Sequence, residues 1–198
     1  MHPQTQEEID YMLTVPYLSA VGSLNYLSTM TRPDISYAVG YLGRFSSNPG
    51  PRHWAAVKHL FRYLKGFMDY KLTYSGKDTS VVFDTYCDAS HGDCLDSGRS
   101  TGGYLTVMGG GAIGCSSKLQ PIVALSSTEA EYIVATEAAK EILWMRNILH
   151  GFGFPQHGAS LLHICDCTPT WFDLLLFAFI ISHRYLIVIS SHDCVEPI

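Results

Sequence analysis

The first third of the chain repeats apolar residues every three to four positions, the spacing of amphipathic helices. This spacing predicts helices over residues 17–30, 35–45 and 51–66. The last of them has clear limits, because Pro51 suits a first helical turn and Gly66 suits a helix end. Three short helices joined by short loops predict a small helical bundle.

The predicted helix 51–66 has an apolar stripe and a basic face. Trp54, Leu60 and Phe61 fall on the stripe and are expected to be buried. Basic residues spaced four and three apart share the other face, where they could contact a phosphate backbone or form an ordinary solvated surface. The basic residues of this segment are Arg52, Lys58, Arg62 and Lys65.

Beyond Gly66 apolar and polar residues alternate, which predicts strands. Short turns between these segments favour an antiparallel meander, with an acidic loop at residues 91–98. A long helix and one further strand follow, and such a unit requires a parallel pair in the same sheet. The second part is therefore predicted to be an α/β domain with a mixed sheet and a crossover helix. The predicted elements are strands over 70–74, 81–86, 102–108, 112–116 and 161–165, and a helix over 126–150.

The start of the long helix contains two glutamates with different expected roles. Ser126 and Glu129 match a capping box, so Glu129 is expected to cap the helix and to point away from the core. Glu131 instead heads the apolar stripe that continues through Ala135 and Ala138. A carboxylate on the core side is costly unless it is paired or binds a metal ion. The alternative is a frayed helix end at which Glu131 reaches water.

Three carboxylates are expected at one edge of the predicted sheet. Asp88 ends the strand 81–87 and Asp166 ends the strand 161–165, so parallel pairing would place both at the carboxyl edge. A crossover helix starts at the same edge and delivers Glu131 there. Oxygen ligands suit Mg²⁺, and two such ions about 3.5–4 Å apart could act on a phosphodiester without a nucleophilic side chain.

Composition narrows the class of protein. The 198 residues are 47% hydrophobic and 16% charged, which suits a folded core and excludes a disordered chain. No apolar run reaches 18 residues and the polar N-terminus lacks signal-peptide features, so neither a membrane span nor secretion is expected. Six cysteines without a CxxC pair indicate reduced thiols in an intracellular compartment.

The net charge of −5 is unevenly distributed. Residues 31–77 contain eight Lys or Arg and two acidic residues, whereas the remainder has five basic and sixteen acidic residues. A basic segment suggests a polyanionic partner and an acidic one suggests a metal ion; two solvated surfaces are the alternative. A nucleotide-binding α/β domain is not expected, because the glycines at 109–111 lie between two strands and no Gly-rich loop joins a strand to a helix.

Six segments read TRPDISYAVGYLGRF, HWAAVKHLFRYLKG, YCDASHGD, RSTGGYL, SSKLQPIVALSSTEAEY and EAAKEILWMRNIL. Together they resemble the C-terminal part of the Pol polyprotein of copia-type LTR retrotransposons, over about residues 15–166. The resemblance implies the helical end of a reverse transcriptase over 1–66 and a linker over 67–80. It further implies a partial ribonuclease H-like domain over 81–166 and an unrelated tail over 167–198.

The resemblance implies the ribonuclease H fold and hydrolysis of RNA in RNA–DNA hybrids, within a polyprotein that also contains an RNA-directed DNA polymerase. Asp88, Glu131 and Asp166 match the family's catalytic carboxylates, which hold two Mg²⁺ or Mn²⁺ ions. The implied partners are RNA–DNA hybrid or another nucleic acid and other parts of Pol, with no membrane. The implied location is intracellular, in the cytoplasm, in virus-like particles or in the nucleus.

Two departures from the family pattern lower the activity expected of this chain. Asp88 is followed by A-S-H-G-D in place of A-D-W-A-G, and after Asp166 the family's N-Q-S-A and later H-x-D segments are missing. We hypothesise that this tail arose by a frameshift or by read-through of non-coding sequence. Its apolar run 174–181 is expected to lie as an improvised helix or strand over exposed sheet surface, or to stay exposed and promote aggregation.

Without the fourth carboxylate of the family, the chain is expected to bind Mg²⁺ weakly and to cleave hybrid near background. Two alternatives remain for its role: a non-catalytic nucleic-acid-binding remnant that uses the basic helices, and a structural relic that does neither.

Overall fold

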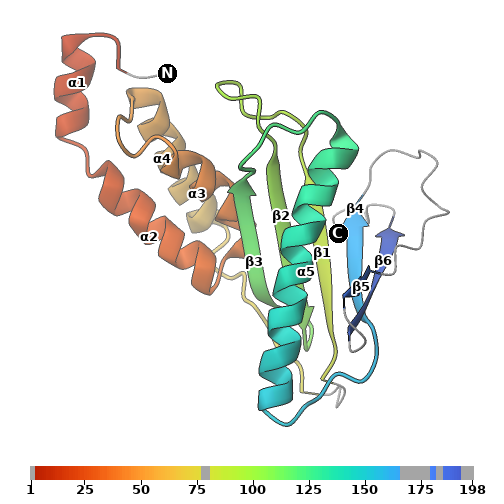
Figure 1. Cartoon of the computed structure of the whole chain (residues 1–198). Coiled ribbons are helices and arrows are strands. Elements are labelled where there is room, and N and C mark those ends of the chain that lie inside the picture. The colour runs from red at the N-terminus through yellow and green to blue at the C-terminus, as the bar shows by residue number, and fades with distance from the viewer. Residues whose placement is uncertain (1–2, 77–80, 166–178, 182–184, 193–198) are drawn as a thin grey trace. The chain divides into compact units, whose positions relative to one another are not determined.

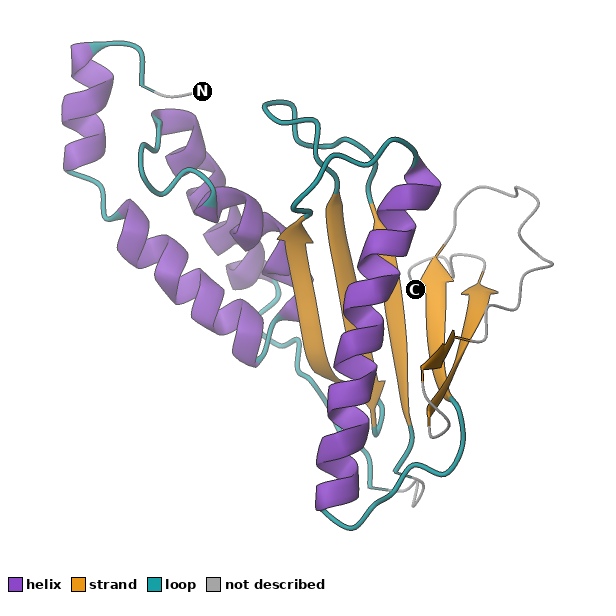
Figure 2. Cartoon of the chain, in the orientation of Figure 1, coloured by secondary structure: helices purple, strands orange, loops and turns teal. Residues whose placement is uncertain are grey.

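The chain divides into two compact units, Met1–Leu72 and Thr73–Ile198. The first unit consists of helices, and the second contains a sheet with one long helix (Figure 2). The predicted mixed α/β class is confirmed. The computed structural model describes residues 3–76, 81–165, 179–181 and 185–192.

The first unit contains one more helix than the hydrophobic pattern predicts. The additional helix is α1, which begins after a Thr-x-x-Glu sequence in which Thr5 Oγ1 accepts a hydrogen bond from the Glu8 amide. That sequence is a capping signal which the apolar spacing alone does not reveal. The limits predicted for α2 and α4 are confirmed. The elements are α1 (Gln6–Leu13), α2 (Tyr17–Met30), a 3₁₀ turn (Pro33–Ile35), α3 (Ser36–Gly43) and α4 (Pro51–Gly66).

The apolar stripes of these helices meet in one core, which includes Leu24, Ile35 and Val57. The prediction that Phe61 is buried is wrong, because its side chain lies at the border of the stripe and is 43% exposed. His53 takes part in the core instead, where its ring stacks on Phe45 at a centroid distance of 4.0 Å. The spacing of apolar residues therefore predicts where the buried stripe runs, but not which residues at its edges are buried.

The second unit is built on a six-stranded sheet with the order β3-β2-β1-β4-β6-β5 (Figure 1). Strand β1 pairs antiparallel with β2 and parallel with β4, as the strand–helix–strand pattern predicts. The strands are β1 (Phe83–Ala89), β2 (Thr101–Met108), β3 (Gly111–Leu119), β4 (Ser160–Cys165), β5 (Phe179–Ile181) and β6 (Tyr185–His192).

Helix α5 (Ser127–Gly151) lies along one face of this sheet, as Figures 1 and 2 show. Its apolar stripe includes Ala138 and Ile142, both fully buried, and packs against Phe83 and Cys87 of β1. Small residues on the helix bring its axis close to the strands. The apolar part of the stripe predicted for this helix is confirmed.

The close packing of α5 against β2 requires a glycine at position 102. A Cβ atom at Gly102 would lie 3.0 Å from Cβ and Cγ2 of Val134. We expect Gly102→Ala to destabilise the second unit by about 1–3 kcal/mol, because overpacking pushes helix and strand apart. Hydrogen exchange of α5 amides measures this loss. The control is Gly158→Ala, because no atom lies within 4 Å of the new Cβ. This variant should change stability by less than about 0.5 kcal/mol. An equal loss of stability in both variants would contradict the packing argument.

The strand predicted over residues 70–74 does not form. Tyr74 and Ser75 instead fasten the chain to the turn between β2 and β3, where Tyr74 Oη donates to the Ala112 carbonyl at 2.6 Å and the Ser75 amide donates to the Gly109 carbonyl at 2.7 Å. The alternation of aromatic residues in this segment reflects tertiary contacts and not strand pairing.

The described parts of the tail form two strands. Strand β6 pairs parallel with β4, and β5 pairs antiparallel with β6 and forms the edge of the sheet. Residues 179–181 of the apolar run form β5, so the expected strand is confirmed for them, but it extends the sheet beside β6 and does not lie over the sheet face. Residues 174–178 of that run lie outside the described residues. Without β6 the edge of β4 would be open, and an open strand edge is a ready template for another strand.

Candidate functional site

The carboxyl edge of the sheet brings together the elements that the sequence predicts to form the site. Strands β1 and β4 run parallel, with Cys87 opposite Ile164 near their ends. Figure 1 shows that the first turn of α5 lies at the end of the sheet to which the β4 arrow points. The predicted parallel pairing of these strands is confirmed, and it places the ends of three elements at one edge.

Asp88 is the penultimate residue of β1, and it is exposed. Its neighbour Cys87 belongs to the core beneath α5, so strand alternation places Asp88 on the other face of the sheet. Gly103 of β2 lies opposite Asp88 in the register. A carboxylate at this position can meet a group on α5 only around the end of the sheet.

The first turn of α5 is closed by a capping box, which confirms the role predicted for Glu129. Ser126 Oγ accepts from the Glu129 amide at 3.1 Å, and Glu129 Oε2 accepts from the Leu125 amide at 2.6 Å. Glu131 is half-buried and follows the fully buried Ala130. The carboxylate of Glu129 is therefore engaged in the cap. Glu131 is the carboxylate on the side of the helix that also bears the buried residues Ala135 and Ala138.

The third predicted carboxylate, Asp166, lies outside the described residues, directly after Cys165 at the end of β4. Within the residues that the structure describes, no group of three or more His, Cys, Asp and Glu side chains could hold a metal ion. Asp88 and Glu131 fit Mg²⁺ or Mn²⁺ in chemical type, because both ions prefer carboxylate oxygens.

Three hydrogen-bonded residues near this edge were not predicted from the sequence. Ser90, two residues after Asp88, is tied to Thr101 at the start of β2, and Gln120 after β3 contacts the first turn of α5. Polar residues in segments that read as turns carry no periodic signal, so only the folded contacts reveal them.

A second group that the sequence did not reveal surrounds Arg146, a cation on α5 that is only 4% exposed. Its guanidinium donates to the Gly158 carbonyl at 2.8 Å, to Ser160 Oγ at 2.7 Å and to the Gln156 carbonyl at 2.6 Å. These bonds hold the segment that leads into β4. Arg146 thereby fixes where β4 begins, at the end of the sheet opposite the carboxylates.

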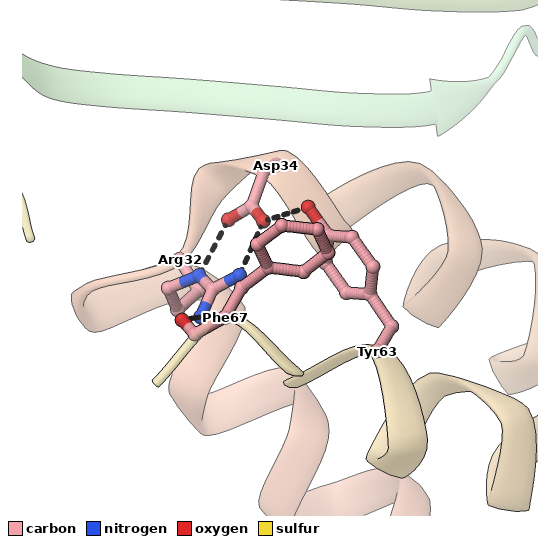
Figure 3. Close-up of polar contacts among 4 residues, drawn as sticks. All are labelled: Arg32, Asp34, Tyr63 and Phe67. Atoms are coloured by element: carbon pink, nitrogen blue, oxygen red, sulfur yellow. Dashed lines mark hydrogen bonds and ion pairs between the residues drawn. The ribbon is translucent and has the colours of Figure 1, made fainter. Parts of the chain in front are cut away.

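The first unit contains a polar cluster around Arg32, shown in Figure 3. The Arg32 guanidinium donates to both oxygens of Asp34, at 2.9 and 2.7 Å, and to the Phe67 carbonyl at 3.0 Å. Tyr63 Oη donates to Asp34 at 3.0 Å. Hydrogen bonding by Arg32 lowers the pKa of Asp34, and hydrogen bonding to Asp34 raises the pKa of Tyr63. The cluster keeps Asp34 ionised and joins α4 to the turn before α3, which is a structural role.

The basic residues predicted on α4 are all exposed, which confirms that part of the prediction. Phe61 lies beside them on the same helix and is also exposed. No helix among the described residues is long and apolar enough to cross a membrane. The exposed basic residues are Arg52, Lys58, Arg62 and Lys65.

Comparison with known proteins identifies relatives over most of the chain. It is 49% identical over 166 residues to the Retrovirus-related Pol polyprotein from transposon TNT 1-94 of Nicotiana tabacum, a match that covers 84% of this chain and 12% of that protein. It is 39% identical over 150 residues to the Retrovirus-related Pol polyprotein from transposon RE2 of Arabidopsis thaliana, covering 76% of this chain and 10% of that protein.

A shorter relative matches along nearly its whole length. The chain is 46% identical over 134 residues to the Secreted RxLR effector protein 161 of Plasmopara viticola, covering 68% of this chain and 94% of that protein. No protein-family model matches the chain. The chain spans only about a tenth of the two Pol polyproteins. With 39–49% identity to Pol polyproteins along most of its own length, the chain belongs to the copia-type retrotransposon Pol family and corresponds to a fragment of such a polyprotein.

Proposed function

We propose that the second unit is a ribonuclease H-type domain that hydrolyses the RNA strand of RNA–DNA hybrids, with activity impaired by its C-terminal sequence. The observation that supports this most is the topology: β1 and β4 are parallel neighbours, and α5 begins at their carboxyl edge. Ligands of open α/β sheets bind outside the carboxyl ends of the strands. The site on this edge contains Asp88, Glu131 and Asp166.

These three carboxylates would hold a pair of Mg²⁺ or Mn²⁺ ions. Such a pair, when bound, supplies an activated water and stabilises the leaving oxygen of the phosphodiester. Asp88 approaches from the face of the sheet away from α5, whereas Glu131 approaches from α5 itself. The positive end of the α5 dipole lies at the same edge and favours the phosphate group of a bound strand.

Binding of Mn²⁺ to the natural chain tests this assignment without requiring cleavage. Bound Mn²⁺ broadens the NMR signals of nearby nuclei, so the amide signals of Asp88 and Glu131 should broaden together at the lowest Mn²⁺ concentrations. Asp88→Asn should weaken binding by about 10–100-fold, because a ligand oxygen with its charge is lost. Asp96→Asn is the matched control in the acidic loop and should bind as the natural chain does. Broadening that starts at other residues and leaves these two unaffected would contradict the proposal.

The exposed basic face of α4 supports nucleic-acid binding by the first unit. Substitution of Lys58, Arg62 and Lys65 together by Gln should weaken binding to all duplexes alike and lower the slope of log affinity against log salt by about 2–3, since each lost phosphate contact removes a released counterion. Fluorescence anisotropy at several salt concentrations measures both quantities.

The matched control for this prediction is Lys140→Gln, which removes an exposed cation from α5 of the second unit. It should leave affinity and salt slope unchanged. Unchanged affinity of the triple variant would instead favour a purely solvated surface, and with it the reading of this unit as a structural remnant.

A further inference from the structure

Gln120 joins two segments of the second unit at the edge where the carboxylates are expected. It follows β3 directly and is only 4% exposed. Its backbone amide donates to the Ser100 carbonyl at 2.8 Å, and its side-chain Nε2 donates to the Ala130 carbonyl at 2.8 Å. Ala130 is fully buried in the first turns of α5 and immediately precedes Glu131. Gln120 therefore connects the sheet to the backbone next to Glu131.

Tight packing limits how the first turns of α5 can move relative to this contact. A Cβ atom at Gly102 would lie 3.0 Å from Val134 and 3.4 Å from Nε2 of Gln120. The helix and the amide of Gln120 thus rest on the bare backbone of β2. A shift of α5 along the strand would break the bond to Ala130 or force Val134 against the strand.

The same stretch of β2 also holds the end of β1. The Ser90 amide donates to the Thr101 carbonyl at 2.9 Å, and the Thr101 amide donates to Ser90 Oγ at 3.0 Å. Ser90 lies two residues beyond Asp88. The segments that contain Asp88 and Glu131 are therefore both fastened to residues 100–102, one through Ser90 and the other through Gln120.

A glutamine side chain is energetically unfavourable at this buried position. Its Oε1 atom is buried and has no hydrogen-bond partner among the residues that the structure describes. An unpaired buried acceptor is unfavourable, and an apolar side chain of the same length would fill the space without it. The hydrogen bond from Nε2 to the Ala130 carbonyl compensates for this cost. An apolar side chain could not make this bond and so could not fix the orientation of the helix start.

We propose that Gln120 is a positioning residue for the carboxylate site: it sets the rotation and height of the first turns of α5 so that Glu131 faces the sheet edge together with Asp88. This role rests on the proposed metal site. It is distinct from general stability, because the rest of α5 is held by its apolar stripe against β1.

The variant Gln120→Met tests this role because methionine keeps the length of the side chain and removes only the amide. In the full chain, we expect the dissociation constant for Mn²⁺ to rise about tenfold, as for loss of other groups that orient metal ligands. Mn²⁺ should still broaden the Asp88 amide signal but no longer the Glu131 signal. Without Mn²⁺, exchange of the amides of residues 130–134 with solvent should accelerate in the same variant.

Ile142→Val serves as the control. It loosens the packing of α5 three turns beyond Ala130, the residue that Gln120 contacts, and leaves the first turn of the helix intact. It should lower stability without changing Mn²⁺ affinity. Equal Mn²⁺ affinity in Gln120→Met and the natural chain would overturn the positioning role while the metal site stands, and so would an equal loss in Ile142→Val. A natural chain that binds no Mn²⁺ at Asp88 and Glu131 would instead overturn the proposed function itself, and the positioning role with it.

Discussion

A chain in which the residues after Asp166 are replaced by the corresponding C-terminus of a Pol relative is expected to cleave RNA in an RNA–DNA hybrid at least about 100-fold faster than the natural chain. Loss of a group that only supports a metal ligand lowers metal affinity or activity by about 10–100-fold. Loss of a fourth ligand should therefore lower cleavage by at least as much. The natural chain retains the carboxyl edge formed by β1, β4 and α5 but lacks an H-x-D segment after Asp166. Cleavage of end-labelled RNA in Mg²⁺ measures the difference.

Asp88→Asn in the replaced chain is the matched control, because asparagine keeps the shape of the side chain and removes its charge. It should return cleavage to background while the fold is kept, since Asp88 is exposed at a strand end. Strong Mg²⁺-dependent cleavage by the natural chain, abolished by Asp88→Asn, would show that the tail does not impair the site. Cleavage in the replaced chain that survives Asp88→Asn would contradict the site itself.

Arg146→Met is expected to destabilise the second unit by about 3 kcal/mol, the largest effect on stability that we anticipate from a single substitution. The variant fills much of the same space but leaves the buried Ser160 hydroxyl and the partly buried carbonyls of Gln156 and Gly158 without their donor. Each buried acceptor left unsatisfied costs about 1–3 kcal/mol, and partial access of water to the loop reduces the sum. Hydrogen exchange of the most protected amides of α5 measures this free energy.

Lys140→Met is the control on the same helix. Lys140 pairs with Glu137 at 2.6 Å, but both side chains are more than half exposed. Exposed pairs contribute about 0–1 kcal/mol, so this variant should remain close to the natural chain. A loss below about 1 kcal/mol in Arg146→Met would show that the segment before β4 does not depend on the guanidinium.

The sequence predicts those elements well whose ends are marked by local chemistry. Helix α4 begins at Pro51 and ends at Gly66, and the Ser126–Glu129 capping box marks the start of α5. Both signals act within one turn of helix and therefore do not depend on the rest of the fold. The parallel pairing of β1 and β4 also follows from sequence order, because a crossover helix allows few topologies.

The residues that the sequence does not predict are polar groups whose partners are distant along the chain. Arg146 bonds to a loop ten or more residues away, and Gln120 bonds to Ala130 across a turn. Gln120 belongs to no periodic pattern, and Arg146 lies on the buried stripe of α5 but carries a charge, so the sequence predicts neither side chain to be buried. Tyr74 alternates with polar neighbours as in a strand, although its hydroxyl bonds to the β2–β3 hairpin and no strand forms there.

The most direct test of the account is the position of Mn²⁺ in crystals of the natural chain soaked in that ion, located by its anomalous scattering. We expect a peak at the carboxyl edge of the sheet, with carboxylate oxygens of both Asp88 and Glu131 at about 2.0–2.3 Å from the ion or bridged to it by one water molecule. A peak bound elsewhere, with none between these two side chains at saturating Mn²⁺, would contradict it.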